Sequence, residues 1–430
     1  MAGRSPTRSR FAVGTMVVLV AFLFPAAAGA KVKDASGLYV PKPNPDARAQ
    51  ITALHQSGAH ADAELIEGMV ETPQAVWFTK GTPDDVRTAV DATVRRAKGT
   101  VPVLVAYNIP FRDCAQFSAG GATNTTDYLA WIDAFAAGIG DAEAIVILEP
   151  DGLGIIPHYV TVEGAVEWCQ PAEADPATAA ADRFFQLNEA LDRLNEQPNV
   201  RVYLDGTHSA WLNVGDNASR LIRAGVARAA GFYLNASNYQ YSPNLVQYGT
   251  WISKCITMLG ARGAPGDCAN QYWNGGPLPA KIAVLLGEWT GVALSNYGVW
   301  SDTSDTPNLN TSGINLRYGS TVGSTHFVID TSRNSQGPWA PPTAPPYPDA
   351  QDWCNPPGRG TGLSPTLDTG TPLVDAYLWI KIPGESDGEC TRGLGPTGTV
   401  DPEWGRVDPA AGQWFPEMAL QLARNAIPGP

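Results

Sequence analysis

Residues 144–154 read AIVILEPDGLG, and the apolar side chains of IVIL are followed at once by Glu149, Pro150 and Asp151. An apolar run without polar alternation is typical of a strand that is buried on both faces, as the strands of parallel sheets are. Proline interrupts such a strand because it has no backbone N–H to donate. The stretch therefore predicts a buried parallel strand with two carboxyl groups at its carboxyl end.

Seven runs of this kind occur along the chain, and each ends in polar or aromatic residues. They are QAVWFT (74–79), VPVLVAYNIP (101–110), AIVILEPD (144–151), VRVYLDGTH (200–208), GFYLNASNY (231–239), STHFVIDTS (324–332) and DAYLWIKIPG (375–384). Helical patterns lie between the runs, with one face formed by Leu129, Ile132, Phe135 and Ile139, another by Phe184, Leu187, Leu191 and Leu194, and Asn217 as the expected cap of a helix through Leu221 and Ile222. Repeated strand and helix imply parallel strands with crossovers, in an open sheet or a closed barrel.

The choice between sheet and barrel rests on the side chains that follow the runs. Residues capable of chemistry stand just past the carboxyl ends of different runs, namely Asp113, Asp151, Asp205 with His208, Asn235, Arg333 and Asp387. A barrel gathers such positions on one rim, whereas an open sheet spreads them along an edge. We therefore predict an α/β fold, a TIM-like parallel β/α barrel with a single site on its rim.

Residues 255–323 break the rhythm of strand and helix. The region is rich in Gly, Asn, Ser and Thr, and it holds an eighth run, KIAVLLGEW (281–289). Cys255 and Cys268 bracket a short loop at its start. We interpret the stretch near 255–310 as an insertion into one barrel domain.

The first thirty residues have the features of a secretory signal. Three arginines precede the apolar run 11–24, and small residues follow it up to Ala30. The run is too short and wrongly flanked for a membrane-spanning helix. We expect a secreted, extracellular protein without membrane association, in which residues 31–430 form a single catalytic domain and which acts as a monomer.

The charge of the chain bears on its partners. Taking these three arginines from 29 basic residues, against 42 acidic ones, lowers the formal net charge from −13 to about −16. An acidic surface repels phosphate, so nucleic acid is not an expected partner. A neutral or cationic ligand suits this surface better.

The six cysteines are even in number, which in an exported chain argues for three disulfides, with fifteen pairings open. The sequence contains no CxxC or HExxH motif and only five histidines. Neither feature favours a metal site, and we expect neither a metal nor another cofactor.

Paired carboxyl groups at a barrel mouth can divide acid and base roles. Partial desolvation raises the pKa of a carboxyl group, and a second carboxylate nearby raises it further. Asp151 and Asp113 follow two successive runs, so we expect one of them to hold a proton near neutral pH. The ordinary alternative for either aspartate is a helix N-cap.

Aromatic and charged residues beside this rim point to a sugar cleft. Flat aromatic faces pack against sugar rings, and Trp77, Tyr107, Trp211 and Trp353 stand next to polar rim residues, although most tryptophans in proteins are core residues. In KIPGESDGEC (381–390), Lys381 lies close in sequence to Glu385 and Asp387. Lys381 and Arg333 would favour an ionised Asp387 that can deprotonate water, although a lysine beside two acids can also be merely structural.

Four segments resemble signature segments of glycoside hydrolase family 6, whose members cut β-1,4-glucan with inversion. They are VAYNIPFRDCAQFSAGGA (105–122), AIVILEPDGL (144–153), HFVIDTSRN (326–334) and LWIKIPGESDG (378–388). The resemblance runs from about residue 74 to 415 and omits the stretch near 255–310. It implies a distorted barrel of seven parallel strands, which leaves KIAVLLGEW in the insertion.

The same resemblance implies a role for each matching residue. Asp151 would be the proton donor, Asp113 would raise its pKa, and Asp387 would be the base. Sugar or hydroxyl contacts would come from Trp77, Tyr107, Arg112, His208, Trp211, Asn235, Trp353, Lys381 and Glu385, with Asp205 and Arg333 in support. Family disulfides would pair Cys114 with Cys169 and Cys354 with Cys390, leaving Cys255 with Cys268. Inversion would require the carboxyl groups to lie about 6.5–9.5 Å apart across the cleft.

Two departures from the family pattern concern water and sugar contacts. The family's water-holding serine would fall at Ala119, and Ser118 is one position away. Trp211 is followed by Leu212, Asn213 and Val214, without the further tryptophan of members that thread chain ends.

The length of the loop after Asp387 separates two modes of cleavage. Only Gly388 and Glu389 stand between Asp387 and Cys390, too few to roof a tunnel. We therefore expect an endo-acting β-1,4-glucanase with an open groove. The alternatives are a cellobiohydrolase roofed by the insertion, a hydrolase of another polymer such as mixed-linkage glucan, and a glucan-binding protein without activity.

Overall fold

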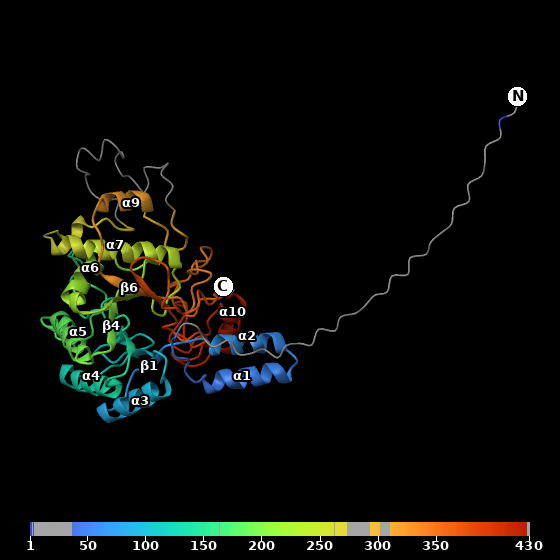
Figure 1. Cartoon of the computed structure of the whole chain (residues 1–430), viewed down its shortest axis with the longest axis horizontal. Helices are drawn as coiled ribbons and strands as arrows, with labels where there is room; N and C mark the ends of the chain where they lie inside the picture. The colour runs from blue at the N-terminus through green and yellow to red at the C-terminus, as the bar shows by residue number, and fades with distance from the viewer. Residues whose placement is uncertain are drawn as a thin grey trace. The chain divides into compact units, whose positions relative to one another are not determined.

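Seven parallel strands in sequence order form the centre of the computed structural model (Figure 1). The structure describes residues 1, 3 and 37–427, except 163, 262, 273–292 and 302–309. Residues 36–430 form one compact unit. The predicted signal segment lies almost entirely outside the described residues, and so does KIAVLLGEW.

Each predicted run contains one strand of the sheet. The strands are β1 (Val76–Phe78), β2 (Val103–Ala106), β3 (Ala144–Leu148), β4 (Val200–Asp205), β5 (Gly231–Leu234), β6 (His326–Asp330) and β7 (Val374–Leu378). Each pairs in parallel with the next, so that Leu104 lies opposite Val146 and Val146 opposite Val202. The seven-stranded α/β barrel expected from the sequence is confirmed.

The barrel is distorted because β1 and β7 do not pair as strands. Two hydrogen bonds nevertheless cross the seam between them. The Ala75 N–H donates to the Trp379 carbonyl at 2.9 Å, and the Trp77 indole N–H donates to the Ile380 carbonyl at 2.7 Å. The curled sheet therefore brings β1 close to the residues that follow β7.

Both faces of the strands are apolar, for two different reasons. Val105 and Ile147 point into the barrel and pack with Tyr203 and Tyr233. Their neighbours in sequence, such as Val146, point outward and pack against the helices. Full burial of such a side chain contributes roughly 1.5–3 kcal/mol to stability, which explains why the strands lack polar alternation.

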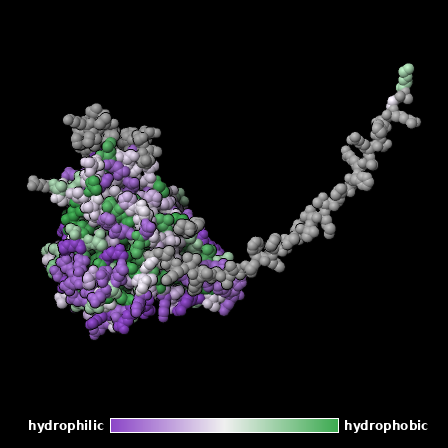
Figure 2. All heavy atoms as spheres, in the orientation of Figure 1, coloured by the Kyte–Doolittle hydropathy of each residue, from purple (hydrophilic) through white to green (hydrophobic). Residues whose placement is uncertain are grey.

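Helices cover the outer face of the sheet. They are α3 (Pro83–Arg96), α4 (Thr125–Ile139), α5 (Ala179–Asn195), α6 (Val214–Arg223) and α7 (Ser242–Gly260). The expected faces of α4 and α5 are confirmed, since both pack into the large apolar core. In the view of Figure 2 the outer surface over α3 and α4 is mainly hydrophilic.

The prediction of Asn217 as a helix cap is wrong. Asn213 caps α6 by accepting from the Asp216 N–H, and Asn217 lies one turn inside the helix. The Asn217 amide instead donates to the Gly206 carbonyl and the Tyr248 hydroxyl at 2.7 and 2.8 Å. It is a buried polar link between the end of β4 and α7.

Helices outside the strand–helix repeat include α1 (Pro45–Gln56), α2 (His60–Val70) and α10 (Pro416–Arg424). They form a separate apolar cluster with Trp379 and Trp414 and lie side by side in Figure 1. No described helix has both the length and the apolar character needed to cross a membrane.

The described parts of the insertion pack on α7. A disulfide joins Cys255 in α7 to Cys268, and α9 (Thr311–Tyr318) lies against the same helix. The Trp300 ring stacks on Trp251 with ring centres 5.5 Å apart. The insertion is therefore attached to the barrel at both of its ends.

Candidate active site

The carboxyl ends of the strands surround a cleft of about 990 Å³. Eleven of the fourteen site residues expected from the sequence line it. They are Trp77, Tyr107, Arg112, Asp113, Asp151, His208, Trp211, Trp353, Lys381, Glu385 and Asp387. The barrel thus brings together side chains that are up to about 310 residues apart in sequence.

The two acids that follow β3 point in different directions. Glu149 is fully buried, and its carboxylate accepts hydrogen bonds from the Asn108 and Ile109 N–H groups at 2.9 and 3.0 Å. Burial raises the pKa of Glu149 to about 7, although these two donors oppose the rise. Glu149 therefore ties the end of β3 to the turn after β2, and it is Asp151 that reaches the cleft.

Backbone conformation produces this division. Glu149 and Asp151 both have left-handed backbones, with φ of 51° and 63°. Asp113, on the neighbouring loop, has φ of 59°. Non-glycine residues held in this region cost about 1–3 kcal/mol each and cluster at functional sites.

Asp151 is the carboxyl group with the strongest reason to stay protonated. Burial raises its pKa well above the usual value, and the charges of Asp205, Asp113 and Asp387 raise it further. Its carboxyl group makes no hydrogen bond to another described residue, and no helix begins near it, since α5 starts at Ala179. The helix-cap alternative for Asp151 is thus excluded, and the side chain is free to meet a ligand.

Asp113 lies in a short turn that closes the loop after β2. Its Oδ2 accepts the Ser118 N–H at 2.6 Å. Burial raises the pKa of Asp113 to about 6, while the Ser118 N–H and Arg112 act in the opposite direction. Asp113 is thus ionised near neutral pH, and its charge favours a proton on Asp151. Both Ser118 and Ala119 line the cleft beside it.

Asp387 is held in the ionised state, in contrast to Asp151. Its Oδ2 accepts from the Arg333 guanidinium at 2.9 Å, the Asn355 N–H at 3.0 Å and the Tyr239 hydroxyl at 3.1 Å. Its Oδ1 lies 3.2 Å from the Lys381 ammonium. Burial alone would raise the pKa of Asp387, but Arg333 and Lys381 outweigh it and hold the pKa below the usual value.

Three expected site residues lie beneath the cleft and do not line it. Asp205 is buried and accepts from the Leu153, Gly154 and Thr207 N–H groups at 2.8–3.1 Å. Arg333 is buried, and its guanidinium donates to the Asp387 carboxylate.

For Asn235 the expected hydroxyl contact does not fit the structure. Its amide donates to the Asp330 carbonyl at 2.9 Å and accepts from the Gln240 N–H at 2.9 Å, so it is buried and bonded to the backbone.

Aromatic rings form the walls of the cleft. The Tyr107 ring packs edge-on against Trp77 at 5.4 Å, and the Arg112 guanidinium lies 4.5 Å over it. His208 lies next to Trp211, and burial lowers the pKa of His208 to about 3. His208 is therefore neutral under ordinary conditions and can both donate and accept hydrogen bonds.

Several residues of the site were not predicted from the sequence. Trp168 lines the cleft with 54% of its surface exposed, between Glu167, which pairs with the buried Arg220, and the disulfide-bonded Cys169. A tryptophan held on both sides and open to the cleft has the geometry of a sugar platform. A lone tryptophan in a loop carries no sequence signal that separates it from a core residue.

Two further residues, Asp330 and Asn355, position the functional loops. The Asp330 carboxylate accepts from the Ser237, Ile380 and Lys381 N–H groups at 3.0–3.2 Å. Asp330 lies within the predicted segment HFVIDTSRN (326–334), at the end of β6, so its place at a strand end was the available signal.

Three disulfides are present among the described residues: the two pairs implied by the resemblance, and the pair that these two leave over. They are Cys114–Cys169, Cys255–Cys268 and Cys354–Cys390. The first fastens the residue after Asp113, and the third fastens the loops that carry Trp353 and Asp387.

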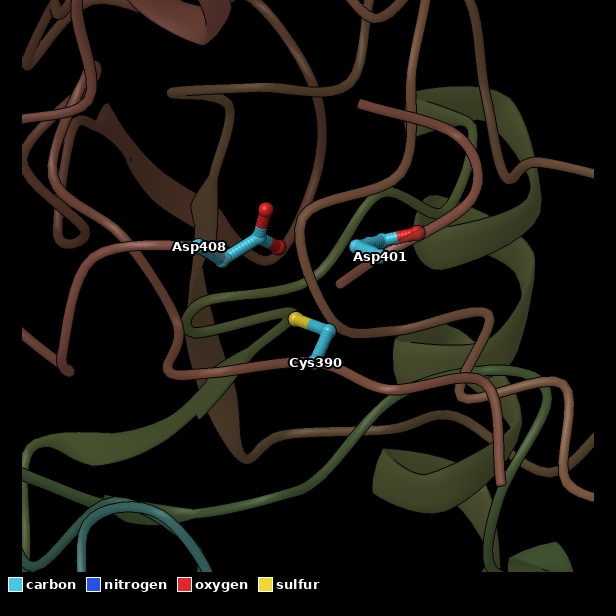
Figure 3. Close-up of side chains that lie close together, drawn as sticks. All are labelled: Cys390, Asp401 and Asp408. Carbon is cyan, nitrogen blue, oxygen red and sulfur yellow. The ribbon is translucent and has the colours of Figure 1, made fainter. Parts of the chain in front are cut away.

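One group of possible metal ligands occurs among the described residues, outside the cleft, and consists of Cys390, Asp401 and Asp408 (Figure 3). Cys390 is bonded to Cys354 and has no thiolate to offer. Asp401 is paired with Arg392 at 2.7 Å. These residues do not fit a metal site.

Comparison with known proteins agrees with this geometry. The model of the glycosyl hydrolases family 6 matches residues 33–426. Endoglucanase 1 of Streptomyces halstedii is 31% identical, over 93% of this chain and 92% of the relative. The solved endoglucanase Cel6 of Mycobacterium tuberculosis, in complex with methyl-cellobiosyl-4-deoxy-4-thio-β-D-cellobioside, is 30% identical, with a TM-score of 0.59 over 91% of this chain and 98% of that one.

Another relative is longer than the present chain. Endoglucanase A of Thermobispora bispora is 32% identical over 83% of this chain, which covers 56% of that relative. The match to the family model spans nearly the whole sequence and includes every residue that lines the cleft. The chain belongs to glycosyl hydrolase family 6.

Proposed function

We propose that the protein is a secreted endo-β-1,4-glucanase that hydrolyses cellulose-type chains with inversion and acts as a monomer. The observation that carries the proposal is that Asp151 and Asp387 line the same cleft, where the pKa of Asp151 is raised and that of Asp387 is lowered. Environments that push the pKa values of two carboxyl groups apart in this way supply an acid and a base. Endoglucanases among the relatives support the same reaction.

In the proposed reaction Asp151 donates its proton to the glycosidic oxygen as the bond from that oxygen to the anomeric carbon breaks. A water molecule attacks the anomeric carbon from the opposite face and loses a proton to Asp387, directly or through a second water. Asp113 favours the protonated form of Asp151 until the bond is cut. Both proton transfers use side chains of this chain, so the proposal requires no cofactor.

The substrate would lie along the aromatic walls of the cleft. Trp77, Trp211 and Trp353 offer flat faces for glucose rings, and we add Trp168 as a fourth platform. Arg112, His208, Lys381 and Glu385 line the same cleft and can bind hydroxyl groups. A neutral polysaccharide suits the acidic protein, which disfavours nucleic acid as a partner.

Endo action is proposed because only two residues separate Asp387 from Cys390. A loop this short, closed by the disulfide to Cys354, leaves no length for a roof over the cleft. Cleavage inside a chain then follows from an open groove.

A cellobiohydrolase is the second candidate, and one contact favours it. Asn296 and Tyr297 of the insertion line the cleft, and the Tyr297 hydroxyl donates to Asp352 at 2.8 Å. The insertion therefore reaches the cleft and could cover part of it.

Viscometry separates the two candidates. The viscosity of carboxymethylcellulose should fall steeply before many reducing ends are released if cleavage is internal. A slow fall in viscosity, with cellobiose as the sole early product, would favour the cellobiohydrolase. Asp151→Ala serves as the control that assigns the activity to this site.

A further inference from the structure

A second pair of acids lies behind Asp387, outside the cleft. Asp401 and Asp408 are both buried, and an oxygen of each lies within 4.8 Å of the other (Figure 3). The reaction described above uses neither of them.

The charges around this pair do not balance if both acids are ionised. Arg392 is fully buried, and its guanidinium donates to Asp401 at 2.7 and 3.2 Å. Asp401 also accepts the Glu403 N–H at 2.9 Å. Asp401 is thus fully paired as an anion, and no second buried cation contacts Asp408 among the described residues.

One oxygen of Asp408 lacks a partner. Oδ1 is buried and meets no N–H or O–H donor in the described part of the chain. An ionised carboxylate in that position would be costly, whereas a protonated oxygen can donate to Asp401. Burial raises the pKa of Asp408 to about 7, and the charge of Asp401 adds to the rise.

The other oxygen of Asp408 is linked to the active site by hydrogen bonds through Asn355. Oδ2 accepts from the Asn355 amide at 2.9 Å. Asn355 in turn accepts the Asp387 N–H at 2.7 Å through its side-chain oxygen and donates its own N–H to Asp387 Oδ2 at 3.0 Å. Asn355 therefore holds both the backbone and the carboxylate of Asp387.

The orientation of the Asn355 amide is determined by its neighbours. Its nitrogen faces only acceptors, which are Asp408 Oδ2, Ser386 Oγ and the Gly388 carbonyl, each at 2.9 Å. Asn355 also has a left-handed backbone, with φ of 40°, and its carbonyl accepts from the Trp404 indole at 2.7 Å. Such a conformation persists only where the surroundings hold it.

We propose that Asp408 is a positioning residue: as a neutral carboxylic acid that donates to Asp401, it orients Asn355, and Asn355 orients Asp387. The catalytic part of this inference rests on the proposed function, whereas the proton on Asp408 does not. The charged groups that bear on Asp408 are Asp401 and Arg392. On the far side of Asn355, the charges of Arg333 and Lys381 bear on Asp387.

Two variants of Asp408 test the positioning role. Asp408→Asn matches the shape and hydrogen bonds of the neutral acid, and its kcat on cellohexaose should stay within about twofold of the original. Asp408→Leu removes every hydrogen bond at similar volume and should lower kcat about 10- to 100-fold with little change in KM, as supporting residues of a site do. The acid limb of the kcat profile should also move to higher pH in Asp408→Leu alone. The reason is that Asp387 loses the hydrogen bond from the Asn355 N–H, a bond that lowers its pKa.

Thermal unfolding tests the proton without any substrate. A carboxyl group whose pKa is raised in the folded state contributes stability that is complete below its unfolded pKa and lost as pH rises through its folded pKa. The Tm of Asp408→Asn minus that of the original should therefore rise between about pH 4 and 7 and stay level above. This arm also shows that the variant folds.

The outcomes separate the two proposals. If the original protein cuts no β-1,4-glucan, the proposed function fails and the unfolding arm still decides whether Asp408 is neutral. A Tm difference that does not change with pH overturns the neutral acid. An unchanged kcat and acid limb in folded Asp408→Leu overturn the positioning role.

Discussion

The Arg333 guanidinium donates a hydrogen bond of 2.9 Å to Oδ2 of Asp387, and both side chains are buried. The link joins the end of β6 to the loop after β7 and offsets the cost of burying a carboxylate. With Lys381 on the other oxygen, it keeps Asp387 ionised in a site where burial drives Asp151 toward protonation.

Removal of the Arg333 charge should therefore impair both activity and stability. In Arg333→Met the pKa of Asp387 rises, so the acid limb of the kcat profile should move to higher pH. Breaking a buried ion pair on one side costs about 3–5 kcal/mol of stability, measurable by urea unfolding. Arg333→Lys keeps the charge and should retain the position of the acid limb; a shift equal to that of Arg333→Met would contradict the electrostatic explanation.

Asp151→Asn should reduce kcat on cellohexaose about 10²- to 10⁴-fold, the range of a lost general acid. Binding of cellohexaose, measured by calorimetry, should change little because the side chain keeps its shape. A substrate whose leaving group needs no proton, such as a β-cellobiosyl fluoride, should be cut with a much smaller loss. Equal losses on both substrates would mean that Asp151 does not donate the proton.

The alkaline limb of the kcat profile should belong to Asp151, since activity needs its proton. Asp113 is ionised above about pH 6, and its charge raises the pKa of Asp151. Asp113→Asn removes that charge and should move the alkaline limb to lower pH by about one unit. An alkaline limb that stays in place would show that the charge of Asp113 does not raise the pKa of Asp151.

Trp168→Ala tests the platform that the sequence did not reveal. Loss of a stacked ring should weaken cellohexaose binding about 2- to 10-fold, since ring stacking contributes about 0.5–1.5 kcal/mol beyond area burial. Val166→Ala is the matched control, because Val166 is 59% exposed in the same loop and does not line the cleft. Equal affinities of the two variants would exclude Trp168 from the substrate path.

The sequence predicted the parts of the molecule that depend on local pattern. The strands could be recognised because β3 and its neighbours are apolar on both faces, and their order follows from the strand and helix repeat. Placement of reactive residues at strand ends then located the cleft, since parallel strands share one carboxyl edge.

The sequence could not assign directions that depend on tertiary contacts. Glu149 and Asp151 are two residues apart, and only the left-handed backbones at both positions direct one into the core and the other into the cleft. Asn217 has the residue type of a helix cap, but Asn213 takes that role and Asn217 bonds to Tyr248. Asn235 follows a strand as a ligand-binding residue would, yet its amide is used by the backbone around it.

The configuration of the newly formed reducing end tests the central claim most directly. Proton NMR during cleavage of cellohexaose should show the α-anomer first, with the β-anomer appearing only as mutarotation proceeds, because water enters opposite the leaving oxygen. The β-anomer as the first product would mean that a carboxylate attacks the sugar, which contradicts the inverting reaction with Asp387 as base.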